Sequence, residues 1–261
     1  MVTRLVYDLP EAEYHADRDT LSSTGAKTLL RSPAQFRWEQ DGHPVTSDAF
    51  VVGSLVHALV LGQPYADIQV KLDGRTKEGK AQKAQADADG LRLISQDDWD
   101  SAHRMADAVL GNRMAADLFS NGRAEVSAYG TEPISGVAMR GRFDWLRNDG
   151  GIVDLKTTAN AEPNKFRYST FDYGYYIQAA WYWHLGVENG IDVSYYPIVA
   201  VGKSAPHQVT ICELKTAYIE DGWAEAEKAC DIYKRCRAFG EWPDWPENQE
   251  VYVFDNPRRR A

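Results

Sequence analysis

The sequence contains few cysteines. Its 261 residues include three, Cys212, Cys230 and Cys236, and none of them forms a C-x-x-C pair. Three thiols with this spacing are too few for a four-thiolate zinc or iron–sulfur site, and an odd number argues against a disulfide framework. The sequence therefore predicts no iron–sulfur cluster, and it favours reduced, partly buried cysteines in a cytoplasmic protein.

Long apolar runs and an excess of positive charge are also missing. The longest apolar stretch, residues 49–62, is shorter than the ~18–20 residues that a membrane-spanning helix needs, so it predicts a buried helix and no membrane partner. The N-terminus has no signal-peptide pattern. With 29 Lys and Arg against 38 Asp and Glu, the net charge is −9, which excludes a basic protein that coats nucleic acid.

The chain shows no internal repeat and no clear interdomain linker. Its length is enough to bury a large core, and 44% of its residues are hydrophobic. We predict a single α/β domain over 1–261, with a helical N-terminal part at about 14–120, a catalytic sheet with its helices at about 121–240, and an irregular tail at 241–261.

Hydrophobic periodicity predicts where the helices and strands lie. Helical spacing is found over 21–38, where Pro33 interrupts it, and over 48–61, 97–118, 172–189 and 216–239. Runs typical of strands cover 124–131, 137–146, 151–157, 194–201 and 207–214. A turn sequence at 147–150 makes the first three runs an antiparallel meander. Pro197 predicts an edge position or a bulge for the fourth run.

Two acids and a lysine lie together on this predicted meander. Asp144 is on one strand, while Asp154 and Lys156, two residues apart on the neighbouring strand, share one face. Two carboxylates beside an ammonium are costly unless a cation binds the acids. Oxygen ligands suit Mg²⁺, for which Mn²⁺ can substitute, and the Leu155 carbonyl is placed to be a further ligand. This spacing predicts metal-dependent phosphodiester hydrolysis, in which Lys156 positions or deprotonates the attacking water.

Positive charge is concentrated in a few places. Residues 71–88 are basic and small, so they cannot form core, and they predict a loop followed by an exposed helix. Arg75, Lys77 and Lys80 in this segment, together with Arg142, are candidate DNA contacts, although a solvated loop is the alternative. The many aromatic residues of 168–183 favour core and oligomer contacts over a platform for base stacking.

Several motifs resemble those of the PD-(D/E)xK nucleases, and within them the RecB-like exonucleases that include RecE and lambda-type phage recombination enzymes. Asp144 stands in a G-R-x-D context similar to that of the family's first acid, although Phe143 replaces the proline. The stretch from Asp154 to Thr158 is similar to the D-x-K-T-T form of RecE-like members. Two further motifs occur in the expected order: G-x-x-x-H at Gly53 to His57, and Q-x-x-x-Y at Gln178 to Tyr182.

The resemblance implies a fold and a set of site residues. The fold would be a restriction-endonuclease-like α/β core, in which a mixed sheet with an antiparallel meander is flanked by helices. His57 would be a metal ligand and Glu125 would lie near the metal, although a glutamate at the start of a strand is often only exposed. Gln178 and Tyr182 would belong to the catalytic site, or would form a packing pair. The residues implied to contact DNA or its 5′ phosphate are Ser22, Arg31, Ser32 and Thr157.

The function that the resemblance implies is a Mg²⁺-dependent exodeoxyribonuclease acting on the ends of linear double-stranded DNA. It would resect DNA 5′→3′ and leave 3′ single-stranded tails for a single-strand annealing protein. The enzyme would be a ring-shaped homo-oligomer, a trimer or tetramer, in the bacterial host cytosol if a phage encodes it. Two alternatives stay open: a non-catalytic DNA-end-binding or recombination scaffold on a nuclease fold, and a restriction or repair-type endonuclease.

Overall fold

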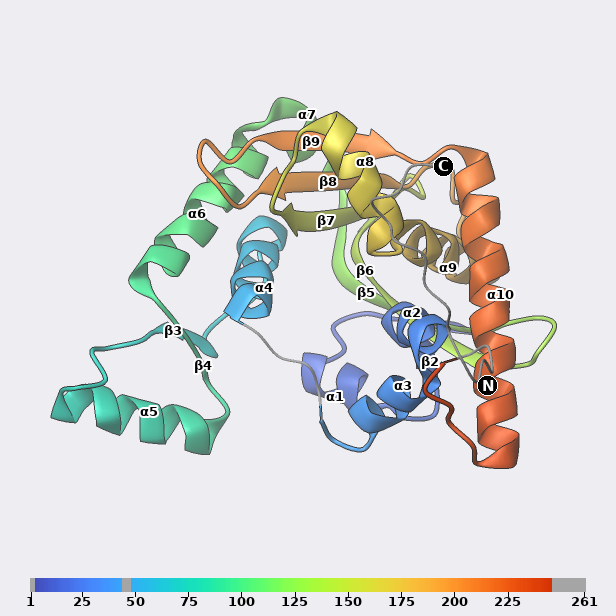
Figure 1. Ribbon diagram of the computed structural model, residues 1–261. Coiled ribbons are helices and arrows are strands. Elements are labelled where there is room, and N and C mark those ends of the chain that lie inside the picture. The colour runs from blue at the N-terminus through green and yellow to red at the C-terminus, as the bar shows by residue number, and fades with distance from the viewer. Residues whose placement is uncertain (1–2, 44–47, 246–261) are drawn as a thin grey trace, which may run out of the picture.

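The computed structural model describes residues 3–43 and 48–245, and a mixed β-sheet with helices on both faces organises them (Figure 1). The sheet has the order β1-β5-β6-β7-β8-β9, and β2 pairs with β6. Its strands are β1 (Arg4–Val6), β2 (Leu21–Ser22), β5 (Gly122–Thr131), β6 (Ala138–Arg147), β7 (Ile152–Thr158), β8 (Pro197–Gly202) and β9 (Val209–Glu213). This is the predicted α/β fold class, although the two short N-terminal strands were not predicted.

The predicted antiparallel meander is confirmed. Strand β5 pairs antiparallel with β6, and β6 pairs antiparallel with β7. The chain then crosses through α8 (Pro163–Asp172) and α9 (Tyr175–Glu188) and returns as β8, which pairs parallel with β7. The sequence pattern missed α8.

The prediction that Pro197 marks an edge strand or a bulge is wrong. Strand β8 is buried and lies between β7 and β9. Pro197 is its first residue, where the ring costs the sheet little because the ladder of hydrogen bonds starts there.

Three N-terminal helices of the described chain precede residue 44: α1 (Glu11–Ala16), α2 (Ser23–Arg31) and α3 (Pro33–Gln40). Pro33 interrupts the helical pattern as predicted, because a proline fits the first position of a helix. The Ser22 and Ser32 hydroxyls cap α2 and α3 by accepting hydrogen bonds from the backbone N–H groups of Gly25 and Gln35.

Helix α4 (Asp48–Leu61) leads into a segment that projects from the sheet at the left of Figure 1. This arm, residues 66–94, consists of β3 (Ile68–Val70), α5 (Lys77–Asp89) and β4 (Arg92–Ile94), with β3 and β4 paired in parallel. The predicted exposed helix in the basic segment is confirmed. The single helix predicted over 97–118 is divided into two helices, α6 (Gln96–Gly111) and α7 (Arg113–Leu118). The division occurs at Asn112, because its side chain caps the N-terminus of α7.

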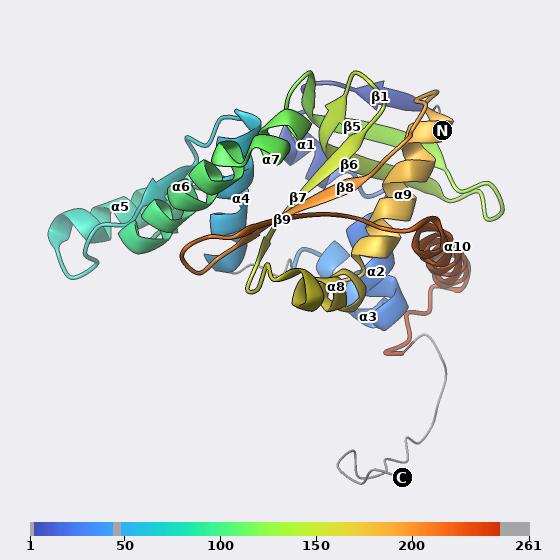
Figure 2. The same cartoon turned by 90° about the horizontal axis from the view of Figure 1, so that it is seen from above.

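Two hydrophobic clusters cover the two faces of the sheet (Figure 2). On one face, α2, α9 and the long α10 (Thr216–Phe239) pack against residues such as Ile152 and Ile198. On the other face, α4 and α6 pack against Val153 and Leu155. Successive residues of β7 therefore point to opposite layers, which places Asp154 on the α9 side.

No helix among the described residues is long and apolar enough to cross a membrane. The longest apolar stretch of the sequence forms α4, whose Leu55 and Val56 are fully buried against the sheet. All three cysteines are free thiols, as predicted.

Candidate active site

The candidate site lies where β6 and β7 separate. The two strands pair only near their hairpin turn, at Trp145 with Val153 and at Leu146 with Ile152. Beyond these pairs the Asp144 carboxylate bridges the strands, since its Oδ2 accepts a hydrogen bond of 2.8 Å from the Leu155 backbone N–H. This fork, formed by Asp144 on β6 and residues 154–156 on β7, opens both strands toward a cavity while keeping Asp144 in a fixed orientation.

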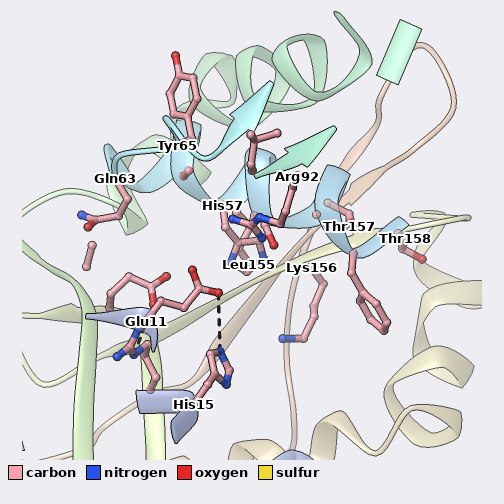
Figure 3. Close-up of a pocket in the computed structure, with 18 of the residues that line it drawn as sticks. Glu11, His15, His57, Gln63, Tyr65, Arg92, Leu155, Lys156, Thr157 and Thr158 are labelled. Carbon is pink, nitrogen blue, oxygen red and sulfur yellow. Dashed lines mark ion pairs between the residues drawn. The ribbon is translucent and has the colours of Figure 1, made fainter. Parts of the chain in front are cut away.

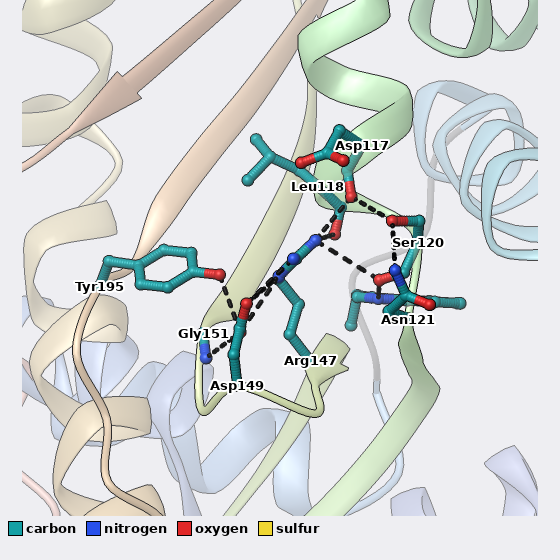
Figure 4. Close-up of polar contacts among 9 residues, drawn as sticks. Asp117, Leu118, Ser120, Asn121, Arg147, Asp149, Gly151 and Tyr195 are labelled. Carbon is teal, nitrogen blue, oxygen red and sulfur yellow. Dashed lines mark hydrogen bonds and ion pairs between the residues drawn. The ribbon is translucent and has the colours of Figure 1, made fainter.

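The turn of this hairpin is tied to the rest of the molecule. Arg147 donates hydrogen bonds to the backbone carbonyls of Asp117 and Leu118, and it forms an ion pair of 3.0 Å with Asp149 (Figure 4). The Tyr195 hydroxyl donates a further hydrogen bond to Asp149 at 2.8 Å. Hydrogen bonds from Arg147 hold the pKa of Asp149 at about 2, so this network stays charged in the neutral pH range.

Three potential metal ligands come together at the open side of the fork. Ligand atoms of His57, Glu125 and Asp144 lie within 4.8 Å of one another. His57 extends from α4, and its Nδ1 is 3.7 Å from Asp144 Oδ2. Glu125 reaches the cluster because its backbone has a φ of 53°, which interrupts the pairing of β5 between Ala124 and Val126. A non-glycine residue in this conformation is uncommon, and such positions often occur at functional sites.

The electrostatics of this cluster favour a bound cation. Burial, followed by the nearby Asp144 carboxylate, raises the pKa of Glu125 to about 8. Arg142 opposes this effect only partly, with its Nε 3.8 Å from Glu125 Oε2. Two carboxylates and an imidazole this close are a donor set that suits Mg²⁺ or Mn²⁺.

The other side of the fork is an ion pair. Lys156 Nζ is 2.6 Å from Asp154 Oδ2, and Gln178 Nε2 on α9 donates a hydrogen bond of 2.7 Å to Asp154 Oδ1. Asp154 is 1% exposed. Burial alone would lower the pKa of Lys156, but the carboxylates of Asp154 and Asp144 outweigh it and raise that pKa. Lys156 is therefore an ammonium at neutral pH.

Asp154 lies beside the three-residue cluster and outside it. Its Oδ2 has the Lys156 ammonium nearby but no hydrogen bond of good geometry, so this buried oxygen retains capacity for a cation. The Leu155 residue, whose carbonyl was predicted as a ligand, borders the cavity. Both positions are compatible with the predicted ligand set.

Tyr182 lies in the core, one helical turn from Gln178. It is 8% exposed, and its ring packs at 5.3 Å from the Phe143 ring centroid. Burial raises the pKa of Tyr182 well above its usual value. A Cβ at Gly141 would come 2.9 Å from the Tyr182 ring, so this close approach of β6 and α9 requires glycine. In the structure Tyr182 sets the spacing between helix and strand.

Sequence reasoning missed Lys27 on α2. Its Nζ lies 5.9 Å from the Tyr175 ring centroid, and Lys156 Nζ lies 5.1 Å from the same centroid. Burial and the positive charge of Lys156 lower the pKa of Lys27 to about 8. The available signal was helical spacing, since Lys27 and Arg31 are four residues apart and share one face of α2.

A cavity of about 1060 Å³ is bordered by His57, Glu125, Lys156 and Tyr175. It is bordered by β7 through Leu155 to Thr158, by α1, by the base of the arm and by the segment around α8 (Figure 3). Glu11 and His15 of α1, which form an ion pair of 3.7 Å, face it across from His57. The cavity is large enough to admit a nucleotide and its phosphate.

The predicted DNA-contacting residues are distributed over several regions. Arg31 is exposed near the end of α2, and Thr157 borders the cavity. Arg142 also borders it, but donates hydrogen bonds to Ser127 Oγ and the Leu9 carbonyl. The arm residues Arg75, Lys77 and Lys80 are exposed, on a part of the chain that projects from the sheet. The structure thus brings the acids together and leaves these cations around them.

A mixed sheet with an acid on one strand, an Asp-x-Lys pair on its hairpin neighbour and a histidine from a covering helix defines the PD-(D/E)xK nuclease fold. The family description "PDDEXK-like domain of unknown function (DUF3799)" matches residues 22–253. The chain belongs to this family. No curated protein sequence matches the chain.

A solved structure shares this fold. A crystal structure named "Putative exonuclease" from Eubacterium rectale is similar over 97% of both chains, with a TM-score of 0.69 and 17% sequence identity. A phage-related exonuclease from Haemophilus somnus 129PT is matched over 87% of this chain and 99% of that one, with a TM-score of 0.37 and 12% identity. The first of these likenesses supports the architecture described above.

Proposed function

We propose that the protein is a divalent-metal-dependent exodeoxyribonuclease that hydrolyses the phosphodiester bonds of linear double-stranded DNA. The observation that carries this proposal is the fork, where Asp144 lies within 4.8 Å of His57 and Glu125, two residues that border a large cavity, beside a buried Asp154–Lys156 ion pair. This site combines candidate ligands for a cation with an oriented ammonium group. Metal-dependent phosphodiester hydrolysis uses both features.

Each group in the fork has a role in this proposal. His57, Glu125 and Asp144 would hold Mg²⁺, or Mn²⁺ in its place, with Asp154 Oδ2 and the Leu155 carbonyl as further ligands. When bound, the cation supplies positive charge that lowers the pKa of water and screens the charge of the phosphate. Glu125 stays ionised most easily when this charge is present, because burial disfavours its carboxylate otherwise.

Lys156 acts as an ammonium in this proposal. It donates a hydrogen bond to the attacking water or to a phosphate oxygen, and its raised pKa argues against a role as the base that removes a proton. Gln178 holds Asp154, and Asp154 holds Lys156, so this chain of contacts orients the ammonium before the substrate arrives. Lys27, whose ammonium also lies near the Tyr175 ring, would add a second positive charge for the phosphate.

The finer features of the proposal come from the family resemblance of the motifs. We propose 5′→3′ resection that leaves 3′ single-stranded tails, a ring-shaped homo-oligomer, and handover to a single-strand annealing protein. Arg31, with Ser22 or Ser32, would contact the 5′ phosphate or the nearby backbone. Both serine hydroxyls already accept backbone hydrogen bonds as helix caps, but a hydroxyl can still donate one to a phosphate. The exposed arm residues Arg75, Lys77 and Lys80 would contact the duplex backbone.

The test uses linear duplex DNA with a different fluorophore on each 5′ and 3′ end, alongside a closed circular plasmid. With Mg²⁺ we expect stepwise release from the 5′ ends, no product from the circle, and no reaction in EDTA. Lys156→Met, which keeps most of the side-chain volume, should remove this activity while the circular dichroism spectrum is retained. Cutting of the circle as fast as the linear DNA would instead identify an endonuclease, and no cleavage of either substrate would favour a binding scaffold.

A further inference from the structure

An exposed aromatic surface lies beside the candidate active site. It consists of Tyr168 and Phe171 on α8 and Tyr173 at the end of this helix, with 56%, 59% and 64% of these side chains exposed. We call these three residues the α8 aromatic surface. Three exposed rings within six residues are unusual, since rings of this size contribute strongly to stability when they are buried.

The fold itself does not require these rings to be aromatic. Helix α8 is attached to the core by Phe166 and Thr170, which are 1% and 3% exposed and one turn apart. Tyr168 and Phe171 lie on the opposite face of the helix, because each residue advances the side chain by about 100° around the axis. Tyr168 and Phe171 are thus exposed because of the helix face on which they lie, and the attachment of α8 to the core does not depend on their rings.

One end of this surface, at Tyr173, borders the cavity beside the fork. Ser169, Tyr173 and Tyr175 all border that cavity. The Tyr173 and Tyr175 ring centroids are 5.8 Å apart, and the Tyr175 centroid is 5.1 Å from Lys156 Nζ. Two aromatic rings, Tyr175 and Tyr173, therefore lead from the ammonium of the fork to the end of α8.

Charge identifies what can bind here. Lys165 and Arg167 are exposed on α8, and the Arg167 guanidinium lies 4.7 Å over the Tyr168 ring. On the far side, Phe171 stacks on Tyr176, whose surroundings carry the negative charges of Glu225 and Asp221. Asp172, between Phe171 and Tyr173, is also exposed, so the phosphates of an anionic chain would lie near Lys165 and Arg167, beside Tyr168, and away from Asp172 and α10.

We infer that the α8 aromatic surface binds the unpaired bases of a DNA single strand next to the cleavage site. Rings accept bases by stacking while neighbouring cations contact the phosphates, and this combination is typical of sites for single strands. A duplex offers no free base faces except at its last pair, so the exposed rings select the unpaired strand. The position of this strand next to the fork rests on the proposed function, whereas its binding to the rings does not.

The test measures binding of a fluorescent oligothymidylate of about 12 nucleotides, within the range of known single-strand sites, to the full-length protein in EDTA. Tyr168→Ala and Tyr173→Ala should each weaken binding about tenfold, as expected for the loss of one stacked base. Tyr168→Phe keeps the ring and should retain most of the affinity. Binding of a blunt duplex should change less than about twofold in the same variants, because stacking needs free base faces.

Phe239→Ala is the matched control, since Phe239 is an exposed aromatic residue at the far end of α10 and is 75% exposed. It should bind the single strand like the unmodified protein. Equal losses for single strand and duplex, or no loss in either alanine variant, would overturn the inference. So would sedimentation showing that the alanine variants dissociate an oligomer while their affinity for the single strand is unchanged, because the rings would then cover a second copy of the chain.

This experiment separates the two proposals. Binding is measured without metal, and degradation of linear DNA is measured separately with Mg²⁺. Ring-dependent binding without any cleavage would reject the nuclease proposal and keep the single-strand site. Cleavage of DNA together with binding that does not depend on the rings would support the nuclease proposal and reject the single-strand site.

Discussion

The fork and the arm differ in how their charged side chains are surrounded. In the fork, Asp154 is 1% exposed and its two oxygens face Lys156 and Gln178. In the arm, Lys77 and Lys80 are exposed, and Arg75 forms an ion pair of 3.0 Å with its near neighbour Asp73. A buried charge depends on particular partners, whereas an exposed charge interacts mainly with solvent and salt. Substitutions in the fork should therefore change chemistry and stability, and substitutions in the arm should change mainly the affinity for DNA.

The largest effect is expected from Asp154→Asn. Loss of this carboxylate removes the partner that orients Lys156 and a candidate metal ligand, so the rate of DNA hydrolysis should fall by at least about a thousandfold. Asp107→Asn on α6 is the control, because Asp107 is exposed and lies outside the fork. Single-turnover kinetics with saturating protein measure the effect. Activity within about tenfold of the unmodified protein would mean that the fork is not the reaction centre.

Lys27→Met should have the next largest effect. The fork would lose one of the two ammonium groups next to Tyr175, and we expect the rate at saturating DNA to fall between about tenfold and a hundredfold. Lys27→Arg, which keeps the charge, should recover part of the rate. If methionine and arginine behave alike, the charge of Lys27 is unimportant and the residue acts only by packing.

The same variant tests the pH dependence of stability. The pKa of Lys27 is about 8 in the folded protein, below its usual value near 10.5, so the folded state disfavours the ammonium. The contribution of Lys27 to the free energy of unfolding is therefore largest above pH 10.5, where the amine is neutral in both states. This contribution is lost as the pH falls toward 8. Lys27→Met should therefore unfold at a higher denaturant concentration than the unmodified protein at pH 7, and the difference should shrink above pH 10. A difference that does not vary with pH would contradict this explanation.

Replacing Lys77, Lys80 and Lys83 together by alanine tests whether the arm contributes to DNA binding. These three residues are exposed on α5, so the melting temperature should stay the same. Binding to duplex DNA should weaken, and the dependence of log K on log salt should decrease by up to about 0.9 per lost phosphate contact. Lys215→Ala, at the exposed start of α10 and outside the arm, serves as the control. An unchanged salt dependence would show that the arm does not contact DNA.

The smallest effect is expected from Glu125→Gln in protein without metal. Burial and Asp144 raise the pKa of Glu125 to about 8, so the folded state favours the protonated acid. The contribution of protonated Glu125 to the free energy of unfolding is complete below pH 4.5. It is lost as the pH rises through 8. At pH 8 to 9 the glutamine variant should be more stable by roughly 1 kcal/mol, and Mg²⁺ should raise its melting temperature less. A metal-induced shift equal to that of the unmodified protein would remove Glu125 from the ligand set.

Much of the site follows from strand periodicity. Residues two apart on a strand share a face, which is sufficient to bring Asp154 and Lys156 within 2.6 Å of each other. The turn at 147–150 predicted the hairpin that carries Asp144, and helical spacing predicted the bounds of α4 and α10. These features depend on interactions between residues that are close in the sequence.

Other features could not be predicted from local patterns. Strands β1 and β2 are two or three residues long, and pairing with β5 and β6 creates them. The run around Pro197 became an internal strand because β9 pairs along its other side. Lys27 is part of the site because α2 packs against α9, which brings it to Tyr175.

The sequence alone determined the order of the chemical groups and the faces of the strands and helices on which they lie, because the backbone geometry of each element sets its side-chain period. The tertiary structure decided how far β6 and β7 separate, which cations have buried partners, and which rings of the region 168–183 stay exposed beside the cavity. These outcomes depend on burial and on long-range packing, which change pKa values and exposure without leaving a periodic pattern in the chain.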